Sequence, residues 1–399
     1  MTQAAAPLPP RESTPPIFEP PLPATPRSAP RRPSGLIYTV DDRPPPLPLF
    51  LLGMQHMAVV TSSLVVPLLV ARAAGVDPGA LPGILAMSML AIGIASLIQA
   101  FPLGRFGSGY LVPGFCSVNY FPASMLAAAA GGMPLVFGLT VLAGCLQLGL
   151  ATALRRLRVL FPPEVAGVTV ALVGLEAGFI ALDQIVHPEP GIGLQTSVGI
   201  GLATFGVAAA ISVFAADSLR LYAALIGMAA GVALAAPLGV MAPDAWPRLV
   251  GQPWLAMPGV GHLQWSFSLD PMLLVAFALA AFASTLKTIG AVSTAQRLND
   301  ADWTRPDAGN LQRGVLGDGL ASISAGLLGS TGQNSATSAV GISGATGATS
   351  RWIALALALW LLVMACMPKV AVLLDLLPTM VIGGVLLFAS IYMFVNGVE

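Results

Sequence analysis

The feature that constrains this chain most is a series of long apolar segments with almost no charge. An α-helix needs about 20 apolar residues to cross a bilayer core of roughly 30 Å. Ten segments approach that length, at 48–71, 81–103, 133–154, 161–182, 196–216, 219–241, 271–295, 311–329, 352–374 and 378–396. Charged residues make up only 9% of the 399 residues, against about 25% in a soluble domain. The sequence therefore predicts an all-α polytopic membrane protein and argues against a water-soluble enzyme.

Two further apolar stretches, residues 107–130 and 329–344, are too rich in Gly, Ser and other small residues to form ordinary spanning helices. In hydrocarbon, irregular backbone is tolerated only where it is buried in protein or lines a cavity. One interruption in each half of the chain is typical of a transporter binding site, where half-helices point their N-termini at a solute. Close helix packing through small residues is the alternative. We favour the binding site because polar side chains flank both stretches.

The distribution of basic residues predicts how the chain is oriented. Counting each interrupted stretch as one crossing gives twelve crossings. With the N-terminus inside, the outward loops carry only Arg72, Arg248 and Lys369, which agrees with the positive-inside rule. The inward loops carry nine arginines: Arg105, Arg155, Arg156, Arg158, Arg220, Arg297, Arg305, Arg313 and Arg351. We expect a multi-pass protein of the cell (inner) membrane. Residues 1–46 hold 14 of the 35 prolines and are expected to form a disordered cytoplasmic tail.

Polar side chains inside the apolar segments are costly and are therefore candidates for function. They are Gln55, His56, Gln99, Glu176, Lys287, Asp318, Gln333 and Asn334. His56 is equally compatible with a packed core histidine, and Glu176 with a hydrogen bond between helices. Lys287 must pair, face water or lose its proton, so we hypothesise an ion pair with Asp318. The three cysteines lack CxxC or CxxH spacing, which predicts neither a disulfide framework nor a metal site.

In these residues the sequence resembles the nucleobase–ascorbate transporter family, which includes bacterial uracil and xanthine permeases. The resemblance covers roughly residues 47–399. The motifs that carry it are Gly53-Met-Gln-His56 with Val65-Val-Pro67, Phe161-Pro-Pro-Glu-Val-Ala-Gly167, Thr285-Leu-Lys-Thr-Ile-Gly290, Gly317-Asp-Gly319, and Gln333-Asn334 followed by Thr346-Gly-Ala-Thr-Ser-Arg351. Together and in this order they form a fairly specific set, whereas any one alone is weak.

The resemblance implies an inverted seven-plus-seven repeat in which the third and tenth segments each form a short strand and a half-helix. It implies a core domain, a gate domain and a connecting extracytoplasmic loop. The core would comprise 47–155 and 270–376, the gate 156–241 and 377–399, and the loop 242–269. The family continues for two more helices, so the resemblance leads us to expect a C-terminally incomplete fold, either a fragment or one completed by another protomer.

The resemblance also implies a solute site between the two interrupted segments. Its candidate solute-binding residues are Gln333, Asn334, Lys287, Phe115, Cys116, Ser117, Val118 and His56, with Gln55, Asp318 and Glu176 as coupling or structural polar groups. An amide offers a donor and an acceptor to a base edge that carries both. Lys287 departs from the glutamate usual in the family, and a lysine favours an anionic solute such as urate or a substrate carbonyl.

The function that follows is a secondary active transporter for a nucleobase such as xanthine, urate or uracil, coupled to a proton or sodium gradient. We expect no cofactor, no nucleic-acid partner, contact with the lipid bilayer and, by resemblance, a homodimer. One alternative is a small-anion carrier of the related seven-plus-seven type. Another is a truncated, non-transporting membrane protein. A membrane-embedded enzyme is the weakest alternative, because the chain has no HExxH, GxSxG or GxxxxGK[ST] motif.

Overall fold

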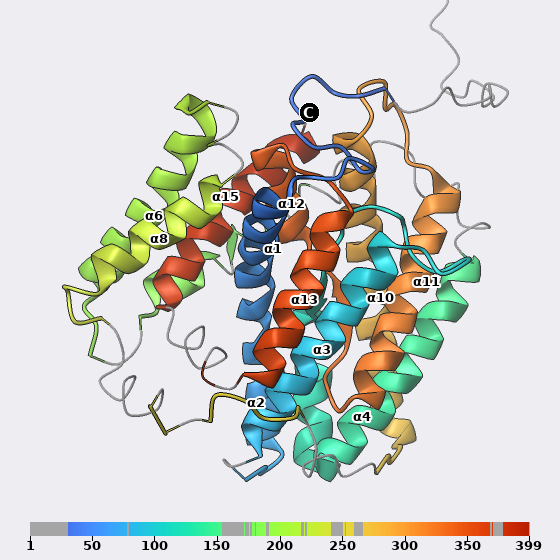
Figure 1. Cartoon of the computed structure of the whole chain (residues 1–399). Helices are drawn as coiled ribbons and strands as arrows, with labels where there is room; N and C mark the ends of the chain where they lie inside the picture. Colours follow the sequence, from blue (N-terminus) through green and yellow to red (C-terminus); the bar gives the residue numbers. More distant parts are fainter. Residues whose placement is uncertain are drawn as a thin grey trace, which may run out of the picture.

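The computed structural model describes residues 31–398 except for 78–79, 154–170, 172–174, 176–177, 180, 189–190, 217–218, 220–221, 241–249, 252, 259–265, 368 and 370–377. The described part is mostly helical (Figure 1). Five of its helical stretches are long and apolar enough to cross a membrane: Pro46–Ala73, Leu81–Ala100, Val118–Ala153, Leu194–Phe214 and Pro271–Leu298. The prediction of a multi-pass helical membrane protein is confirmed. The predicted helix 161–182, with Glu176, falls largely outside the described residues.

The larger group of helices packs around α3 and α11. It contains α1 (Pro46–Thr61), the 3₁₀ turn η1 (Ser62–Leu64), α2 (Val65–Ala73), α3 (Leu81–Ala100), α4 (Phe121–Ala153), α10 (Pro271–Leu298), α11 (Ala308–Leu327) and α13 (Trp352–Cys366). Small residues allow its helices to approach closely. A Cβ added to Gly144 of α4 would lie 2.7 Å from the carbonyl oxygen of Gly319 on α11.

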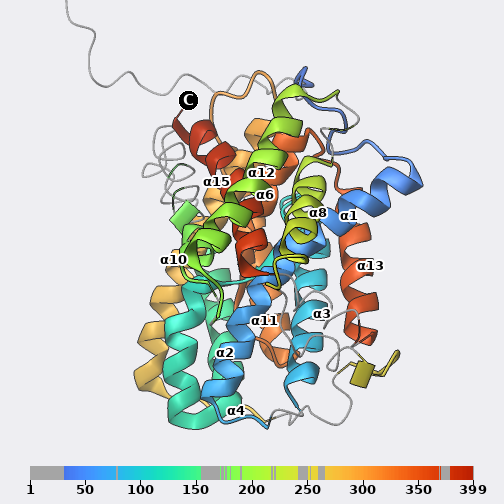
Figure 2. The same cartoon turned by 90° about the vertical axis from the view of Figure 1, so that its left-hand side faces the viewer.

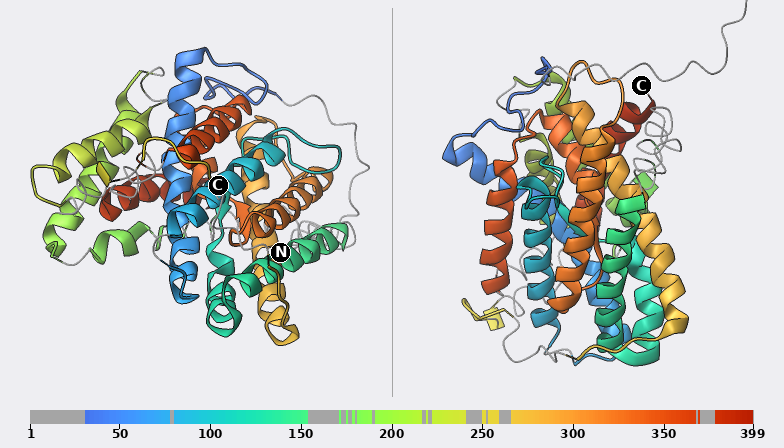
Figure 3. Two further views of the ribbon diagram at one scale, coloured as in Figure 1. Left: turned by 60° about the horizontal axis from the view of Figure 1, so that its bottom comes forward. Right: turned by 90° about the vertical axis from the view of Figure 1, so that its right-hand side faces the viewer.

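The smaller group contains α6 (Leu194–Phe214), α8 (Ala223–Ala235) and α15 (Thr379–Val398), which pack on one another. It lies to one side of the larger group in Figure 1 and in the left view of Figure 3. The short helix α12 (Thr337–Thr346) contacts both groups, since it packs on α15 and on α10. Figure 2 shows α6 and α8 on the viewer's side of the molecule.

Both interrupted stretches depart from continuous helix. The first gives strand β1 (Gly114–Cys116), the 3₁₀ turn η2 (Val118–Tyr120) and the start of α4. The regular helix of α4 breaks at Gly131 and Gly132, where Gly132 has φ of +69°. A positive φ is accessible to glycine at little cost, so this pair separates the half-helix 121–130 from the long helix that follows. The second stretch gives strand β2 (Gln333–Ser335) and α12.

The segment that precedes α1, residues 31–45, is bonded to the larger group, and we call it the strap. Its backbone follows residues 347–351: Ile37 N–H donates to the Gly347 carbonyl at 2.8 Å, and Arg351 N–H donates to the Val40 carbonyl at 3.0 Å. Asp41 and Arg351 form an ion pair at 2.8 Å. The expected disordered tail over 1–46 was therefore too long at its C-terminal end, because carbonyl and N–H partners far along the chain hold the strap.

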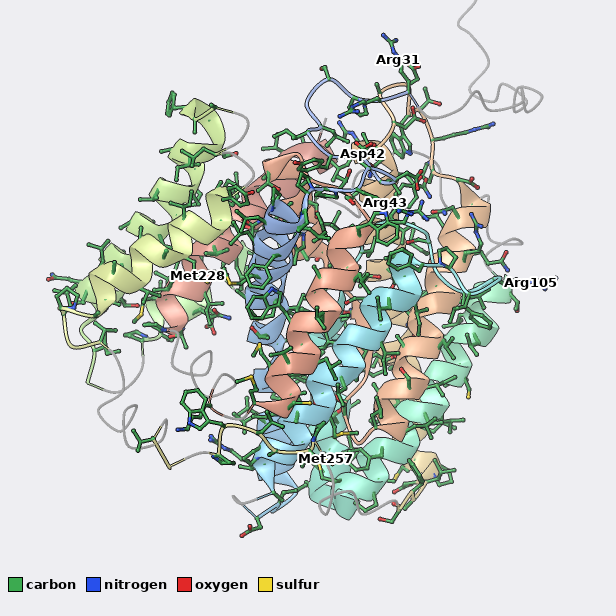
Figure 4. All side chains as sticks on the ribbon, viewed as in Figure 1. Arg31, Asp42, Arg43, Arg105, Met228 and Met257 are labelled. Atoms are coloured by element: carbon green, nitrogen blue, oxygen red, sulfur yellow. The ribbon has the colours of Figure 1, made fainter. Side chains whose placement is uncertain are left out.

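Figure 4 shows Arg31, Asp42 and Arg43 of the strap together at one end of the molecule, opposite Met257. Arg31 N–H donates to a carboxylate oxygen of Asp300 at 3.1 Å, and its carbonyl accepts from Ala301 N–H at 2.9 Å. The Arg43 guanidinium lies 4.3 Å from the ring centroid of Trp352. The strap thus ties the α10–α11 connection to the start of α13.

Candidate functional site

The two interrupted stretches meet inside the helical bundle as a two-stranded antiparallel sheet. The register pairs Gly114 with Ser335, Phe115 with Asn334, and Cys116 with Gln333. The backbone beyond the strands is also paired, since Ala336 N–H donates to the Pro113 carbonyl at 2.7 Å and Ser117 N–H to the Gly332 carbonyl at 2.9 Å. Strands more than 200 residues apart thereby satisfy each other's polar backbone away from water.

Serine hydroxyls from neighbouring helices complete the backbone pairing of β1 and β2. Gly114 N–H donates to Ser96 Oγ at 2.9 Å, and Cys116 N–H donates to Ser63 Oγ at 3.1 Å. Ser322 of α11 donates to the Gln333 carbonyl at 2.9 Å. These serines were not singled out from the sequence. The signal available for Ser322 was its position four residues after Asp318, on the same face of a helix.

A helical N-terminus follows each strand. Ser117 caps η2 by accepting from Asn119 N–H at 3.2 Å, and α4 begins at Phe121. The N-terminus of α12, directly after β2, carries no side-chain cap. The first N–H groups of a helix lack partners within the helix, and its N-terminus is electropositive. The sheet is therefore bordered by two helix ends suited to a carbonyl oxygen or an anion.

Neighbouring side chains of a strand point to opposite faces, and directly opposed residues of paired strands share a face. Cys116 and Gln333 therefore share one face of the sheet, as the contact from Gln333 Nε2 to Cys116 Sγ at 3.5 Å shows. Phe115 and Asn334 share the other face. The two adjacent amides thus border different sides of the sheet.

The two amides carry unused hydrogen-bonding capacity. Gln333 and Asn334 are fully buried, and Gln333 Oε1, Asn334 Oδ1 and Asn334 Nδ2 have no hydrogen-bond partner in the described structure. Burying a polar group unpaired costs about 1–3 kcal/mol. Each face of the sheet therefore carries an amide with unmet hydrogen-bonding capacity, and on the Phe115 face Asn334 offers both a donor and an acceptor.

Asp318 of α11 fixes the position of β2. Its carboxylate accepts from Gln99 Nε2 at 2.5 Å, from the Thr288 hydroxyl, and from Ser335 N–H at 2.8 Å. The hydroxyl of Ser335 also donates to it, at 2.9 Å. Asp318 is 1% exposed. One carboxylate therefore joins α3, α10 and β2 to α11.

On α10, Thr288 donates a hydrogen bond to Asp318. Consecutive helical residues are about 100° apart around the axis, so Lys287 and Thr288 leave α10 in different directions. The Lys287–Asp318 ion pair hypothesised from the sequence stays a prediction. Lys287 is nevertheless buried, at 8% exposed, on a helix that packs against η2, β2 and α12.

His56 joins α1 to α12 behind the sheet. Its Nδ1 lies 2.9 Å from the Leu52 carbonyl, and its Nε2 lies 2.9 Å from Ser343 Oγ. A carbonyl oxygen only accepts, so Nδ1–H donates to Leu52. Ser343 Oγ, the neighbour of Nε2, also donates its hydroxyl to the Ala339 carbonyl at 3.0 Å. In the structure His56 therefore links α1 to α12. Gln55 beside it is buried on α1 as well.

The other predicted site residues lie around the same sheet. Phe115 and Val118 are half-buried, whereas Cys116 and Ser117 are fully buried. The described residues contain no group of three or more His, Cys, Asp or Glu side chains placed to hold a metal ion. These residues form a buried polar cluster around β1 and β2 between apolar helices.

Known proteins resemble this chain in sequence and in fold. Residues 47–399 match the profile of the Permease family of xanthine and uracil permeases. The xanthine permease XanP of Escherichia coli is 28% identical over 90% of this chain and 80% of its own length. The uric acid permease PucK of Bacillus subtilis is 27% identical over 86% and 78%.

Among solved structures, the transmembrane domain of the cyanobacterial bicarbonate transporter BicA superposes with a TM-score of 0.51 at 16% identity, over 90% of this chain and 96% of that domain. That likeness concerns the fold. The family match spans most of the chain, including every described element of the site. The chain therefore belongs to the xanthine and uracil permease family, the nucleobase–ascorbate transporter family that its motifs resemble.

Proposed function

We propose that this chain is a permease that carries a nucleobase such as xanthine or urate across the cell membrane, with the β1–β2 sheet as its binding site. The observation that carries the proposal is the burial of Gln333 and Asn334 with unmatched amide atoms between two helix N-termini. A base presents ring N–H donors and carbonyl acceptors, which an amide matches. The relatives named as xanthine and uric acid permeases support this solute class.

The two groups of helices support transport by movement of one group against the other. We assign α1–α4 and α10–α13 to a core domain and α6, α8 and α15 to a gate domain. The core then carries the binding sheet, and movement past the gate alternately exposes it to each side. The same proposal includes coupling to a proton or sodium gradient, a homodimer, a cytoplasmic N-terminus and location in the inner membrane.

Lys287 sets the charge preference within this proposal. Lys287 is buried on a helix that packs against β2 and η2, and its side chain donates hydrogen bonds, whereas the family's usual glutamate accepts ring N–H groups. We therefore assign to the site a solute that presents an anionic or carbonyl edge to α10, and urate fits this better than a neutral base. Replacing Lys287 by Gln, which removes the charge, should lower urate uptake more than xanthine uptake.

The second candidate is a small-anion carrier of the same fold. The observation that favours it is the combination of Lys287 with the two helix N-termini, and the fold shared with a bicarbonate transporter agrees with it. The two buried amides argue for the base, because a small anion such as bicarbonate has a single O–H to donate to their acceptor oxygens, whereas a base has several ring N–H groups.

Uptake of radiolabelled xanthine, urate, uracil and bicarbonate into cells that express the chain separates these candidates. The matched pair of variants is Gln333→Ala in the site and Gln312→Ala on α11, half-buried and away from the sheet. Saturable uptake of one base, lost in Gln333→Ala and kept in Gln312→Ala at equal protein level, supports the proposal. Saturable bicarbonate uptake without uptake of any base would replace it with the anion carrier.

A further inference from the structure

A cavity lies at the strap end of the molecule, away from the β1–β2 sheet. Its volume is about 570 Å³, within the range of small-molecule sites. It is lined by the strap, by the last turns of α6, α10 and α12, and by the loop after α10: Pro33, Gly35, Leu36, Ser212, Arg297, Leu298, Asp300, Ala301, Trp303, Gly344 and Ala345. No residue of β1 or β2 contributes to it.

Helix α12 connects this cavity to the binding sheet. Its N-terminus follows β2, and its last turn, with Gly344 and Ala345, forms part of the cavity wall. Ten helical residues span about 15 Å. Ser212 of α6 donates to the Ala345 carbonyl at 3.2 Å. The cavity therefore sits where the two groups of helices meet, one short helix away from the sheet.

The walls of the cavity combine a cation, an anion and an aromatic ring. Arg297 supplies guanidinium donors, and Asp300 supplies a carboxylate acceptor whose Oδ1 also accepts from the backbone N–H groups of Arg31 and Asp302. The Trp303 ring forms another part of the wall, on which a flat heterocycle can stack. A guanidinium binds ring carbonyls or negative charge, and a carboxylate binds ring N–H groups. Together they match a planar heterocycle that has adjacent N–H and C=O groups.

We propose that this cavity is a second solute site, in which the same class of oxidised purine binds at the cytoplasmic mouth of the transport route. The proposal rests on the proposed function for the identity of the solute and for the orientation of the strap end. A solute released from the sheet passes along α12 and contacts Arg297, Asp300 and Trp303 before it enters the cytoplasm.

Binding at this cavity is measured by quenching of tryptophan fluorescence on titration of the purified full-length protein in lipid nanodiscs with urate. The measurement is made in the wild type and, to remove the central site, in Gln333→Ala. A stacked purine quenches Trp303, so the saturable component should disappear in Trp303→Phe. Arg297→Gln should weaken the apparent affinity about tenfold, as expected from the loss of one charged hydrogen bond. Arg313→Gln, which removes an exposed arginine outside the cavity, should not change it.

Gly35→Phe provides a second variant that does not depend on removing a charge. A Cβ at Gly35 meets no atom within 4 Å, so a phenyl group can project there without displacing the backbone, and it should obstruct the cavity and reduce quenching. The proposal is overturned if urate causes no Trp303-dependent quenching, or if Arg297→Gln behaves as Arg313→Gln does. If quenching depends on Trp303 and Arg297 while no base is transported, the cavity binds purines and only the proposed function fails.

Discussion

Replacing Asp318 by Asn tests whether one carboxylate holds the β1–β2 sheet in place. The carboxylate accepts from Gln99, Thr288 and both the N–H and the hydroxyl of Ser335. An asparagine of nearly the same shape keeps one acceptor oxygen and turns an NH₂ group toward the remaining donors. Gln99 bonds to one carboxylate oxygen, whereas Thr288 and Ser335 N–H bond to the other. At least one donor therefore meets a donor in either amide orientation.

The size of the effect follows from how many hydrogen bonds the asparagine is unable to make. A hydrogen bond to a charged group contributes about 1.5–3 kcal/mol, and removal of one or two of them lowers the free energy of unfolding by roughly 2–5 kcal/mol. Ser335→Ala keeps the backbone N–H bond to Asp318 and removes only the hydroxyl, so it should cost less, about 1–2 kcal/mol. Because both changes remove the same hydroxyl–carboxylate bond, the double variant should be less destabilised than the sum of the single variants.

Thermal unfolding in detergent, measured by the disappearance of monodisperse protein, ranks the three variants, and uptake of the transported base reports the geometry of the site. Asp302→Asn, at an exposed aspartate of the α10–α11 connection, controls for the removal of a charge. Wild-type thermal stability and uptake in Asp318→Asn would refute the reasoning. So would strict additivity of Asp318→Asn and Ser335→Ala, because it would mean that the two side chains do not share an interaction.

Three further changes test other parts of the structure. Gly144→Val should prevent assembly of the folded protein, because its Cβ would lie 2.7 Å from a backbone oxygen of α11, whereas Gly149→Val on the same helix meets open space and should fold normally by size-exclusion chromatography. Ser343→Ala removes the hydroxyl bound to His56 and should cost about 1 kcal/mol in thermal stability without abolishing uptake; a complete absence of uptake would assign that pair a role in transport. Hydrogen bonds from the Thr39 backbone and hydroxyl, together with the charge of Arg32, outweigh partial burial and lower the pKa of Asp42, so its contribution to strap stability is present at neutral pH and is lost only as pH falls below about 4. Amide exchange over residues 31–45 should show this, and Asp42→Asn should remove the pH dependence.

The sequence predicted the long apolar helices that the structure describes and the positions of both interruptions, because length, hydropathy and small residues are local properties of the chain. A short strand and a half-helix in each interruption came from the family resemblance, and the pairing of the two strands was not predicted. Composition did not predict that residues 31–45 are held against the larger group of helices. Their prolines and arginines are typical of a solvated tail, and their hydrogen-bonding partners lie about 300 residues later in the chain. The hydrogen bond from Thr288 to Asp318 was not predicted, because the residues of α10 that face α11 depend on the rotation of α10 about its axis.

Because β1 pairs with β2, the first strand of the sheet is synthesised well before its partner strand. Residues 114–116 leave the ribosome long before residues 333–335. At roughly 5–20 residues per second, the intervening stretch takes about 10–45 s to translate. During this interval β1 has no partner strand, and unpaired backbone N–H and C=O groups inside a membrane are unfavourable. The nascent first half must wait in a sheltered or partly hydrated setting, such as the insertion machinery, until the second half arrives. Slower elongation between the two strands would lengthen that exposure and should lower the yield of intact protein.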